Sequence, residues 1–212
     1  MAIYEPRDKY YRKARERGLP SRAAFKIEEL IARAKIVPRG ARIADLGCAP
    51  GGWLAIMARA AGPAGRIVGV DLARCANIPA GVIVITGDIL DSATVARVIA
   101  ELGGPADLVT SDLAPKLTGI AARDEARSRE LLTAALEFAR RTLRHGGAMV
   151  AKVFMGAEFK RIVAEFERAF ERLEVTRTGA TRPGSSELYI VAKGFLGDSV
   201  SPLPLASKPP RA

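Results

Sequence analysis

The sequence predicts an α/β protein built on one doubly wound, mostly parallel sheet. From residue 42 onward, short apolar runs rich in Val, Ile and Leu alternate with longer stretches of helical periodicity. Such alternation of strand and helix is typical of a sheet that carries helices on both faces. The apolar runs are continuous, which suits strands covered on both sides. A chain of 212 residues is long enough for one such domain.

The expected elements follow from these local patterns. The strands are predicted at residues 41–48, 65–72, 81–88, 106–113, 148–155, 174–181 and 187–195. The helices are predicted at residues 21–35, 52–61, 92–102, 123–144 and 157–172. In the first of these helices Ile27, Leu30 and Ile31 share one apolar face, and Ser21 is the expected N-cap.

Three regions are expected along the chain. Residues 1–40 form a basic N-terminal arm and a helix packed on the core, residues 41–195 form the main domain, and residues 196–212, with four prolines, are predicted to be disordered. No apolar run approaches the ~18–20 residues of a membrane helix, and no signal-peptide pattern opens the chain. Two cysteines, Cys48 and Cys75, are too few for a four-ligand zinc site or a disulfide framework. We therefore expect a cytoplasmic protein that binds neither a metal ion nor a membrane.

The charge distribution indicates a polyanionic partner. The net charge is +10, and residues 1–42 hold twelve basic and five acidic residues. Within this region, residues 7–18 interleave Tyr10 and Tyr11 with Lys and Arg, which suits phosphate contacts and stacking on unpaired bases. The alternatives are a solvated surface and a helix whose tyrosines anchor it to the core. Nucleic acid is the predicted partner.

A glycine-rich loop follows the first predicted strand. The segment "DLGCAPGGW" (45–53) contains Gly47, Gly51, Gly52 and Trp53. In doubly wound folds, ligands bind beyond the carboxyl ends of the strands, and glycines let the backbone approach them closely. The spacing is neither G-x-G-x-x-G nor that of a P-loop. A specific cofactor site is predicted, with Trp53 either forming a wall of it or packing the first core helix on the sheet.

Acidic residues end the next three predicted strands, at Asp71, Asp88 and Asp112. An acid after the second strand commonly accepts hydrogen bonds from ribose hydroxyls. Three such acids beside a glycine loop describe a pocket for a cationic, nucleoside-containing ligand without a pyrophosphate. S-adenosylmethionine (SAM) fits this description better than NAD.

Lys152 is unusual because it lies inside the apolar run "GGAMVAKVFMG" (146–156). An ammonium is rarely buried without a partner. The alternative is a side chain that reaches solvent from an edge. The single histidine, His145, follows a predicted helix and is interpreted as a structural residue whose charge complements the helix dipole.

The order of several motifs resembles the FtsJ-like (RrmJ) family of SAM-dependent RNA ribose 2′-O-methyltransferases. The resemblance runs from residue 8 to 195 through five segments: "DKYYRKARERGLPSRAAFKIEEL" (8–30), "DLGCAPGGW" (45–53), "SDLAPKLTG" (111–119), "AKVFMG" (151–156) and "SSELYIVAKG" (185–194). It implies a Rossmann-like SAM-dependent methyltransferase fold with a seven-stranded sheet whose last strand is antiparallel. It also implies a substrate, a uridine of 23S ribosomal RNA in an assembled or nearly assembled large ribosomal subunit.

The resemblance further implies residue roles. The implied catalytic set is Lys26, Asp112, Lys152 and Glu187. The implied cofactor contacts are the loop from Gly47 to Trp53, Asp71 near the adenosine ribose, Asp88 near the adenine and Asp112 beside the methionine end. Lys116 departs from the asparagine that is usual in the family, which puts local RNA contacts in question.

Ribose methylation requires removal of a hydroxyl proton, and Lys152 is the predicted general base. A lysine serves as a base when its pKa falls below the ordinary ~10.4, and burial or a second cation has that effect. Two alternatives stay open for the function: methylation of tRNA anticodon-loop riboses, and a non-catalytic RNA-binding role in ribosome assembly. A monomer is expected.

Overall fold

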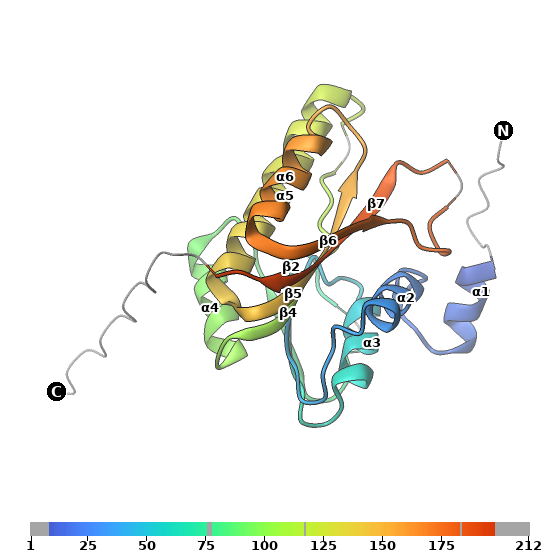
Figure 1. The fold of residues 1–212 in the computed structure, drawn as a ribbon. Helices are drawn as coiled ribbons and strands as arrows, with labels where there is room; N and C mark the ends of the chain where they lie inside the picture. Colours follow the sequence, from blue (N-terminus) through green and yellow to red (C-terminus); the bar gives the residue numbers. More distant parts are fainter. Residues whose placement is uncertain (1–8, 76–77, 117, 183, 198–212) are drawn as a thin grey trace.

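A computed structural model of the protein describes residues 9–75, 78–116, 118–182 and 184–197. The described chain forms one seven-stranded sheet between two layers of helices (Figure 1). Most of the tail that was predicted to be disordered, from residue 198 on, lies outside the described residues, as do residues 1–8 of the basic arm.

The sheet confirms the predicted fold class. Its spatial order is β3-β2-β1-β4-β5-β7-β6. The strands are β1 (Arg42–Leu46), β2 (Arg66–Asp71), β3 (Val82–Thr86), β4 (Ala106–Ser111), β5 (Leu143–Phe154), β6 (Phe170–Thr176) and β7 (Glu187–Phe195). The pairs from β3 to β5 are parallel, whereas β7 is antiparallel to both β5 and β6. The start of β7 therefore lies beside the carboxyl end of β5.

Helices cover both faces of this sheet. They are α1 (Lys9–Glu16), α2 (Ala24–Ala34), α3 (Gly52–Ala61), α4 (Ser92–Leu102), α5 (Ala121–Thr142) and α6 (Phe159–Ala169). The helices α4, α5 and α6 contribute to one hydrophobic cluster, and α2 and α3 contribute to the other, on the opposite face. Helix α1 lies outside α2, where the ring of Tyr10 packs on that of Phe25 at 5.7 Å between centroids (Figure 1).

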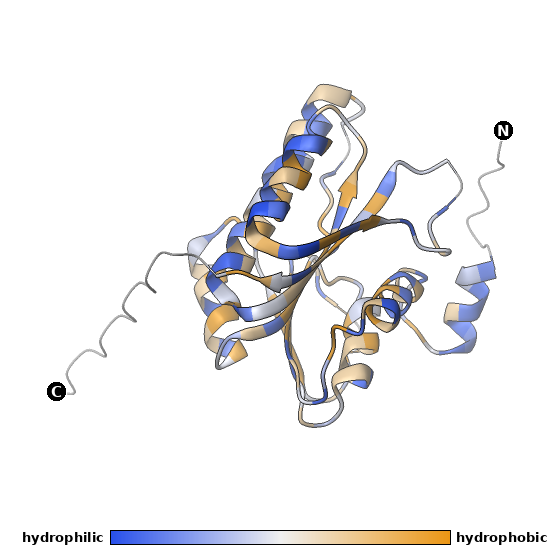
Figure 2. Ribbon diagram, in the orientation of Figure 1, coloured by the Kyte–Doolittle hydropathy of each residue, from blue (hydrophilic) through white to orange (hydrophobic). Residues whose placement is uncertain are grey.

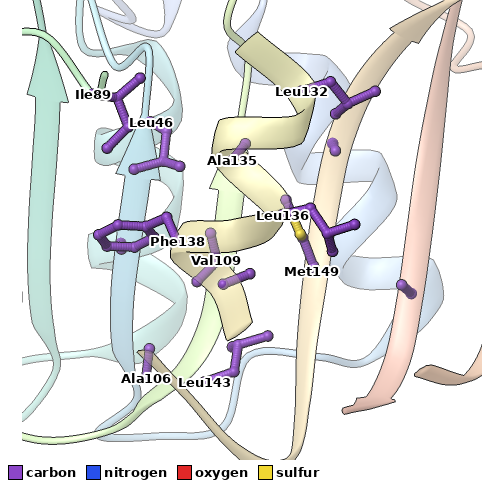
Figure 3. Close-up of a cluster of buried hydrophobic side chains, with 14 of the residues drawn as sticks. Leu46, Ile89, Ala106, Val109, Leu132, Ala135, Leu136, Phe138, Leu143 and Met149 are labelled. Atoms are coloured by element: carbon purple, nitrogen blue, oxygen red, sulfur yellow. The ribbon is translucent and has the colours of Figure 1, made fainter. Parts of the chain in front are cut away.

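Burial of apolar side chains between sheet and helices stabilises the fold. Helix α5 places Leu132, Ala135, Leu136 and Phe138 against the strands (Figure 3). Each large side chain buried in this way contributes about 1.5–3 kcal/mol. The colouring by hydropathy shows the same division, with apolar residues along the central strands and polar residues dominating α1 (Figure 2). Among the described residues, no helix is both long and apolar enough to cross a membrane.

Several details differ from the sequence predictions, including the start of β5 at Leu143 instead of residue 148. The strand predicted at residues 174–181 is β6, which begins at Phe170, directly after α6, because that side chain is buried against Phe166 and Phe195. Residues 177–181 form a turn instead. Ser21 is not the N-cap of α2, since Ala23 takes that position without a side-chain cap. His145 lies near the start of β5, at the opposite end of that strand from Lys152, rather than at a helix end.

Candidate active site

The glycine loop after β1 passes close to the end of β4. Gly47 has a φ of +79°, and a Cβ atom there would lie 3.0 Å from the backbone nitrogen of Leu113 and 3.2 Å from the carbonyl carbon of Asp112. The Asp112 amide in turn donates a hydrogen bond of 2.9 Å to the Leu46 carbonyl. Both the left-handed conformation and the lack of space require glycine at this position.

A cavity of about 1190 Å³ opens above the carboxyl ends of β1, β2, β3 and β4. We call it the large cavity. Four of the residues that were predicted to bind the cofactor line it: Gly47, Asp71, Asp88 and Asp112. The sequence interpretation that these strand ends share one pocket therefore agrees with the geometry.

Asp71 is held firmly at the edge of the large cavity. Its Oδ2 accepts a hydrogen bond of 2.9 Å from the Ala49 amide, and its Oδ1 accepts one of 2.8 Å from the Ala73 amide. Each carboxylate oxygen has a second lone pair. Asp71 can thus join the glycine loop to the loop after β2 and still accept hydrogen bonds from ribose hydroxyls. Asp88 is fixed similarly, because its Oδ1 accepts a hydrogen bond from the Leu90 amide at 2.9 Å.

Trp53 and Gly52 have packing roles beneath the loop. The Trp53 side chain is buried, donates a hydrogen bond of 3.0 Å to the Ala23 carbonyl, and packs against the Tyr189 ring. A Cβ atom on Gly52 would collide with Ser21 and touch Ala24. Of the two interpretations of Trp53, the geometry therefore favours packing of α3 on its surroundings. Gly51, with a φ of +107°, makes the turn into that helix.

Lys152 is paired rather than solvated. Its side chain is 8% exposed, and its Nζ lies 2.8 Å from Asp112 Oδ1. The same Nζ donates a hydrogen bond of 2.9 Å to the Asp112 carbonyl. A buried ammonium is tolerated because a carboxylate and a carbonyl compensate for the lost water.

A second ion pair lies on the neighbouring strand. Lys26 Nζ, from α2, donates a hydrogen bond of 2.6 Å to Glu187 Oε1. Burial raises the pKa of Glu187, but the hydrogen bond and charge of Lys26, the Tyr189 hydroxyl and the charge of Lys152 lower it by more, so that the pKa is below its ordinary value. Glu187 is therefore a carboxylate at neutral pH.

The two ion pairs meet across β5 and β7. In the antiparallel register Lys152 lies opposite Tyr189, and Phe154 lies opposite Glu187. The Tyr189 hydroxyl donates a hydrogen bond of 3.0 Å to Glu187, and Lys26 Nζ lies 5.8 Å from the centre of the Tyr189 ring. The structure thus brings all four predicted catalytic residues to one region at the ends of β4, β5 and β7, where Asp112 lines the large cavity.

Sequence reasoning missed two residues of this region, Tyr189 and Asp45. Tyr189 is fully buried, and burial together with the charges of Asp112 and Glu187 raises the pKa of its hydroxyl, which stays a hydrogen-bond donor. Its position in a continuous apolar strand concealed it. Asp45 lies in the glycine-loop motif, but the sequence did not show that its side chain points into the core.

Asp45 is a buried carboxyl group beneath the loop. It is 0% exposed, and its Oδ1 accepts a hydrogen bond of 2.6 Å from Thr110, while no described residue donates one to its Oδ2. Burial raises its pKa to about 7; the Thr110 hydrogen bond opposes this, and the charges of Asp112 and Asp71 reinforce it. Asp45 is therefore substantially protonated at neutral pH.

This raised pKa makes stability depend on pH. Between the ordinary Asp pKa of ~3.9 and the folded value, the folded state holds one more proton than the unfolded state, so stability falls as pH rises. Ionisation of the buried Asp45 lowers the free energy of unfolding by up to about 4 kcal/mol, and this loss reaches its full size above pH 7. We expect Asp45→Asn to remove the loss. Urea unfolding at pH 5 and pH 8 measures the difference between wild type and variant. An equal difference at both pH values would contradict the assignment.

The large cavity suits SAM in its chemistry. The backbone at Gly47 can approach a ligand closely, Asp71 and Asp88 offer acceptors for ribose and adenine, and Asp112 lies next to the buried ammonium of Lys152. Together with the strand order and the reversed β7, these features define a SAM-dependent methyltransferase with a Rossmann-like fold. The chain belongs to the FtsJ-like methyltransferase family, whose sequence model matches residues 19–195.

Several relatives are similar over almost the whole chain. A protein of Anaeromyxobacter dehalogenans named ribosomal RNA large subunit methyltransferase E is 44% identical, covering 99% of this chain and 79% of that protein. One of the same name from Syntrophobacter fumaroxidans is 43% identical, covering 89% of this chain and 95% of that protein.

Solved structures show the same architecture. A Plasmodium falciparum protein whose crystal structure carries the name ribosomal RNA methyltransferase superposes with a TM-score of 0.75 at 27% identity, covering 84% of this chain and 100% of that one. Aeropyrum pernix fibrillarin, crystallised with natively bound SAM, superposes with a TM-score of 0.53 at 19% identity, covering 79% of this chain and 76% of that one. The second likeness concerns the fold alone.

Proposed function

We propose that the protein transfers a methyl group from SAM to the ribose 2′-hydroxyl of a uridine in 23S ribosomal RNA, within an assembled or nearly assembled large ribosomal subunit. The observation that carries this proposal is the buried pair of Lys152 and Asp112 at the edge of the large cavity. The names of the relatives from Anaeromyxobacter and Syntrophobacter support the choice of RNA.

The chemistry needs a proton acceptor beside the methyl donor. Bound SAM supplies an electrophilic methyl group on a sulfonium. Lys152, an ammonium in its ion pair with Asp112, would first release a proton to solvent. The resulting amine would then accept the hydroxyl proton as the ribose oxygen bonds to the methyl carbon and the carbon–sulfur bond breaks. Asp112 fixes the position of that amine. We assign the ion pair of Lys26 and Glu187, which lies on the strand next to Lys152, to substrate positioning.

RNA would approach the large cavity over exposed basic residues. Three exposed basic residues line this cavity: Lys116, Arg123 and Arg127. Lys116, the residue that departs from the family pattern, therefore lies on the path that we propose for the RNA. In the arm, Arg12, Lys13 and Arg15 are exposed on α1. Tyr10 packs against Phe25, which supports an anchoring role for that ring rather than base stacking.

We expect RNA affinity to fall steeply with salt. Each phosphate contact contributes a slope of roughly −0.7 to −0.9 to the dependence of log K on log salt. Replacing Arg12, Lys13 and Arg15 together by Gln should make the slope shallower, while SAM affinity stays unchanged. Filter binding at several salt concentrations measures both proteins. A flat response of the wild type would contradict an electrostatic role for the arm.

The decisive experiment measures transfer of labelled methyl from SAM to large ribosomal subunits that lack the modification. Free 23S RNA and bulk tRNA serve as parallel substrates, and nuclease mapping locates the label. Label at a uridine ribose of the subunit is the expected result. Label on tRNA alone would move the substrate to anticodon-loop riboses. SAM binding without label on any RNA would favour a non-catalytic assembly factor.

The proposal includes a monomeric protein that works in the cytoplasm. The free thiols of Cys48 and Cys75 suit a reducing compartment. Light scattering of the purified protein at low and high concentration measures the oligomeric state.

A further inference from the structure

A second, smaller cavity opens beside the first, and the chemistry described so far does not use it. We call it the second cavity. It has a volume of about 330 Å³ and lies between α5, the end of β5 and the start of α6. Its walls are mainly apolar and include Leu132, Phe154, Met155, Phe159 and Ile162. Leu132 projects from the part of α5 that lies toward the carboxyl ends of the strands (Figure 3).

The two cavities meet at the buried ion pair. Asp112 lines the large cavity, Lys152 lines the second cavity, and their charged atoms are 2.8 Å apart. Leu113, Asp124 and Arg129 line both cavities. A methyl donor in the large cavity would therefore face an acceptor that enters from the side of the second cavity.

We propose that the second cavity receives the base of the nucleotide whose ribose is methylated. This inference rests on the proposed function. In a nucleotide the base is attached to C1′, the ring carbon next to the one that carries the 2′-hydroxyl. A hydroxyl held at Lys152 therefore places its own base within a few bond lengths, and the second cavity is a space that Lys152 itself lines.

The walls of the second cavity suit a flat aromatic ring. Phe154 and Phe159 are aromatic residues of its lining, and unpaired bases in RNA are commonly recognised by stacking on such side chains. The volume lies near the lower end of the ~300–1,000 Å³ that is usual for small-molecule sites, which suits one base rather than a stacked pair. Enzymes that act on single nucleotides often turn the base out of its stack into a pocket of this kind.

The rim of the second cavity combines an exposed apolar residue with a fixed polar wall. Met155 is 62% exposed at this rim, so its side chain is accessible to an entering base. Two other residues of its lining, Arg129 and Glu158, form an ion pair of 3.1 Å, and Glu125 accepts a hydrogen bond from the Glu158 amide. These contacts hold α5 and α6 at a set separation, so the cavity is formed before a base enters.

Filling the second cavity tests the inference. Ala121 is exposed at the first residue of α5 and lines this cavity, whereas its neighbour Ala122 is exposed and is not among the described residues that line either cavity. We expect Ala121→Phe to lower kcat/KM for large subunits by roughly tenfold to a hundredfold. This is about the change in affinity that stacking one base on an aromatic side chain provides. Ala122→Phe is the matched control and should retain wild-type activity. SAM affinity should be unchanged in both, and thermal unfolding verifies that both are folded.

A substrate with an abasic nucleotide at the methylated position completes the test. On this substrate kcat/KM of the wild type should fall by a similar factor relative to the normal substrate. The kcat/KM of Ala121→Phe should be the same on the abasic and the normal substrate. Met155→Ala, at an exposed position, should raise KM for normal RNA only. Equal activity of Ala121→Phe and Ala122→Phe on normal RNA would overturn the base pocket and leave the proposed function intact. So would a defect of Ala121→Phe that persists on the abasic substrate. Absence of transfer by the wild type to any ribosomal RNA would instead refute the proposed function, and the base pocket with it.

Discussion

Replacing Lys152 by alanine is expected to slow methyl transfer by about 10²- to 10⁴-fold, the usual contribution of a positioned general base. Lys152 is the buried amine nearest to Asp112, and its removal leaves that carboxylate without its cation. SAM affinity should change much less, since Lys152 is not among the described residues that line the large cavity. Single-turnover transfer of labelled methyl and equilibrium binding of SAM measure the two quantities separately.

Two further variants distinguish a base from a positive charge. Arginine keeps the charge but does not release its proton in proteins. We therefore expect Lys152→Arg to be as inactive as Lys152→Ala, whereas Lys160→Ala, at an exposed position of α6, should behave like the wild type. Substantial activity of Lys152→Arg would indicate that Lys152 acts through its charge, and full activity of Lys152→Ala would remove it from the mechanism.

Gly47→Ala is expected to have the second large effect. The left-handed backbone alone costs about 1–3 kcal/mol for a non-glycine residue. The new Cβ would also lie 3.0 Å from the Leu113 nitrogen and 3.2 Å from the Asp112 carbonyl carbon, so the end of β4 must move. Because Asp112 lines the large cavity and holds Lys152, SAM affinity should fall by at least about tenfold, or 1.4 kcal/mol, and methyl transfer should fall with it.

Gly81 provides a matched control for this prediction. It has nearly the same φ, +81°, but a Cβ atom there would meet no atom within 4 Å. Gly81→Ala should therefore lose stability through backbone strain alone and keep its SAM affinity. Calorimetric titration with SAM and urea unfolding of both variants measure the two effects. If Gly47→Ala and Gly81→Ala bound SAM equally well, close contact between the glycine loop and β4 would not matter for the cofactor.

Much of the fold and of the cofactor site was predictable from local patterns. Continuous apolar runs indicated strands covered on both faces, and the protein has a sheet between two helical layers. Gly47, Asp71, Asp88 and Asp112 follow four successive strands, and parallel strands end at one edge of a sheet, so their convergence follows from topology. The resemblance to a family added the roles of Lys26 and Glu187, which spacing alone did not provide.

Element boundaries depended on packing that local pattern does not describe. Residues 174–181 have the composition of a strand, yet β6 begins at Phe170 because its ring packs on Phe166 and Phe195 from other elements. Ser21 has the right chemistry for an N-cap, but the chain turns into α2 two residues later. In both cases the folded chain, through a tertiary contact or a turn, decided where the element begins.

By itself, the sequence determined the fold class, the glycine loop and the acids at the strand ends, because each depends on residues close together in the chain or on the shared edge of parallel strands. The tertiary structure alone decided which groups lose contact with water. It buried Asp45, one of whose carboxyl oxygens has no hydrogen-bond partner among the described residues, and it packed Trp53 against Tyr189. It also paired Lys26 with Glu187, which is distant in sequence, and formed the second cavity. These properties arise where surfaces distant in sequence meet, and burial there sets the protonation of Asp45 and the space that remains for a base.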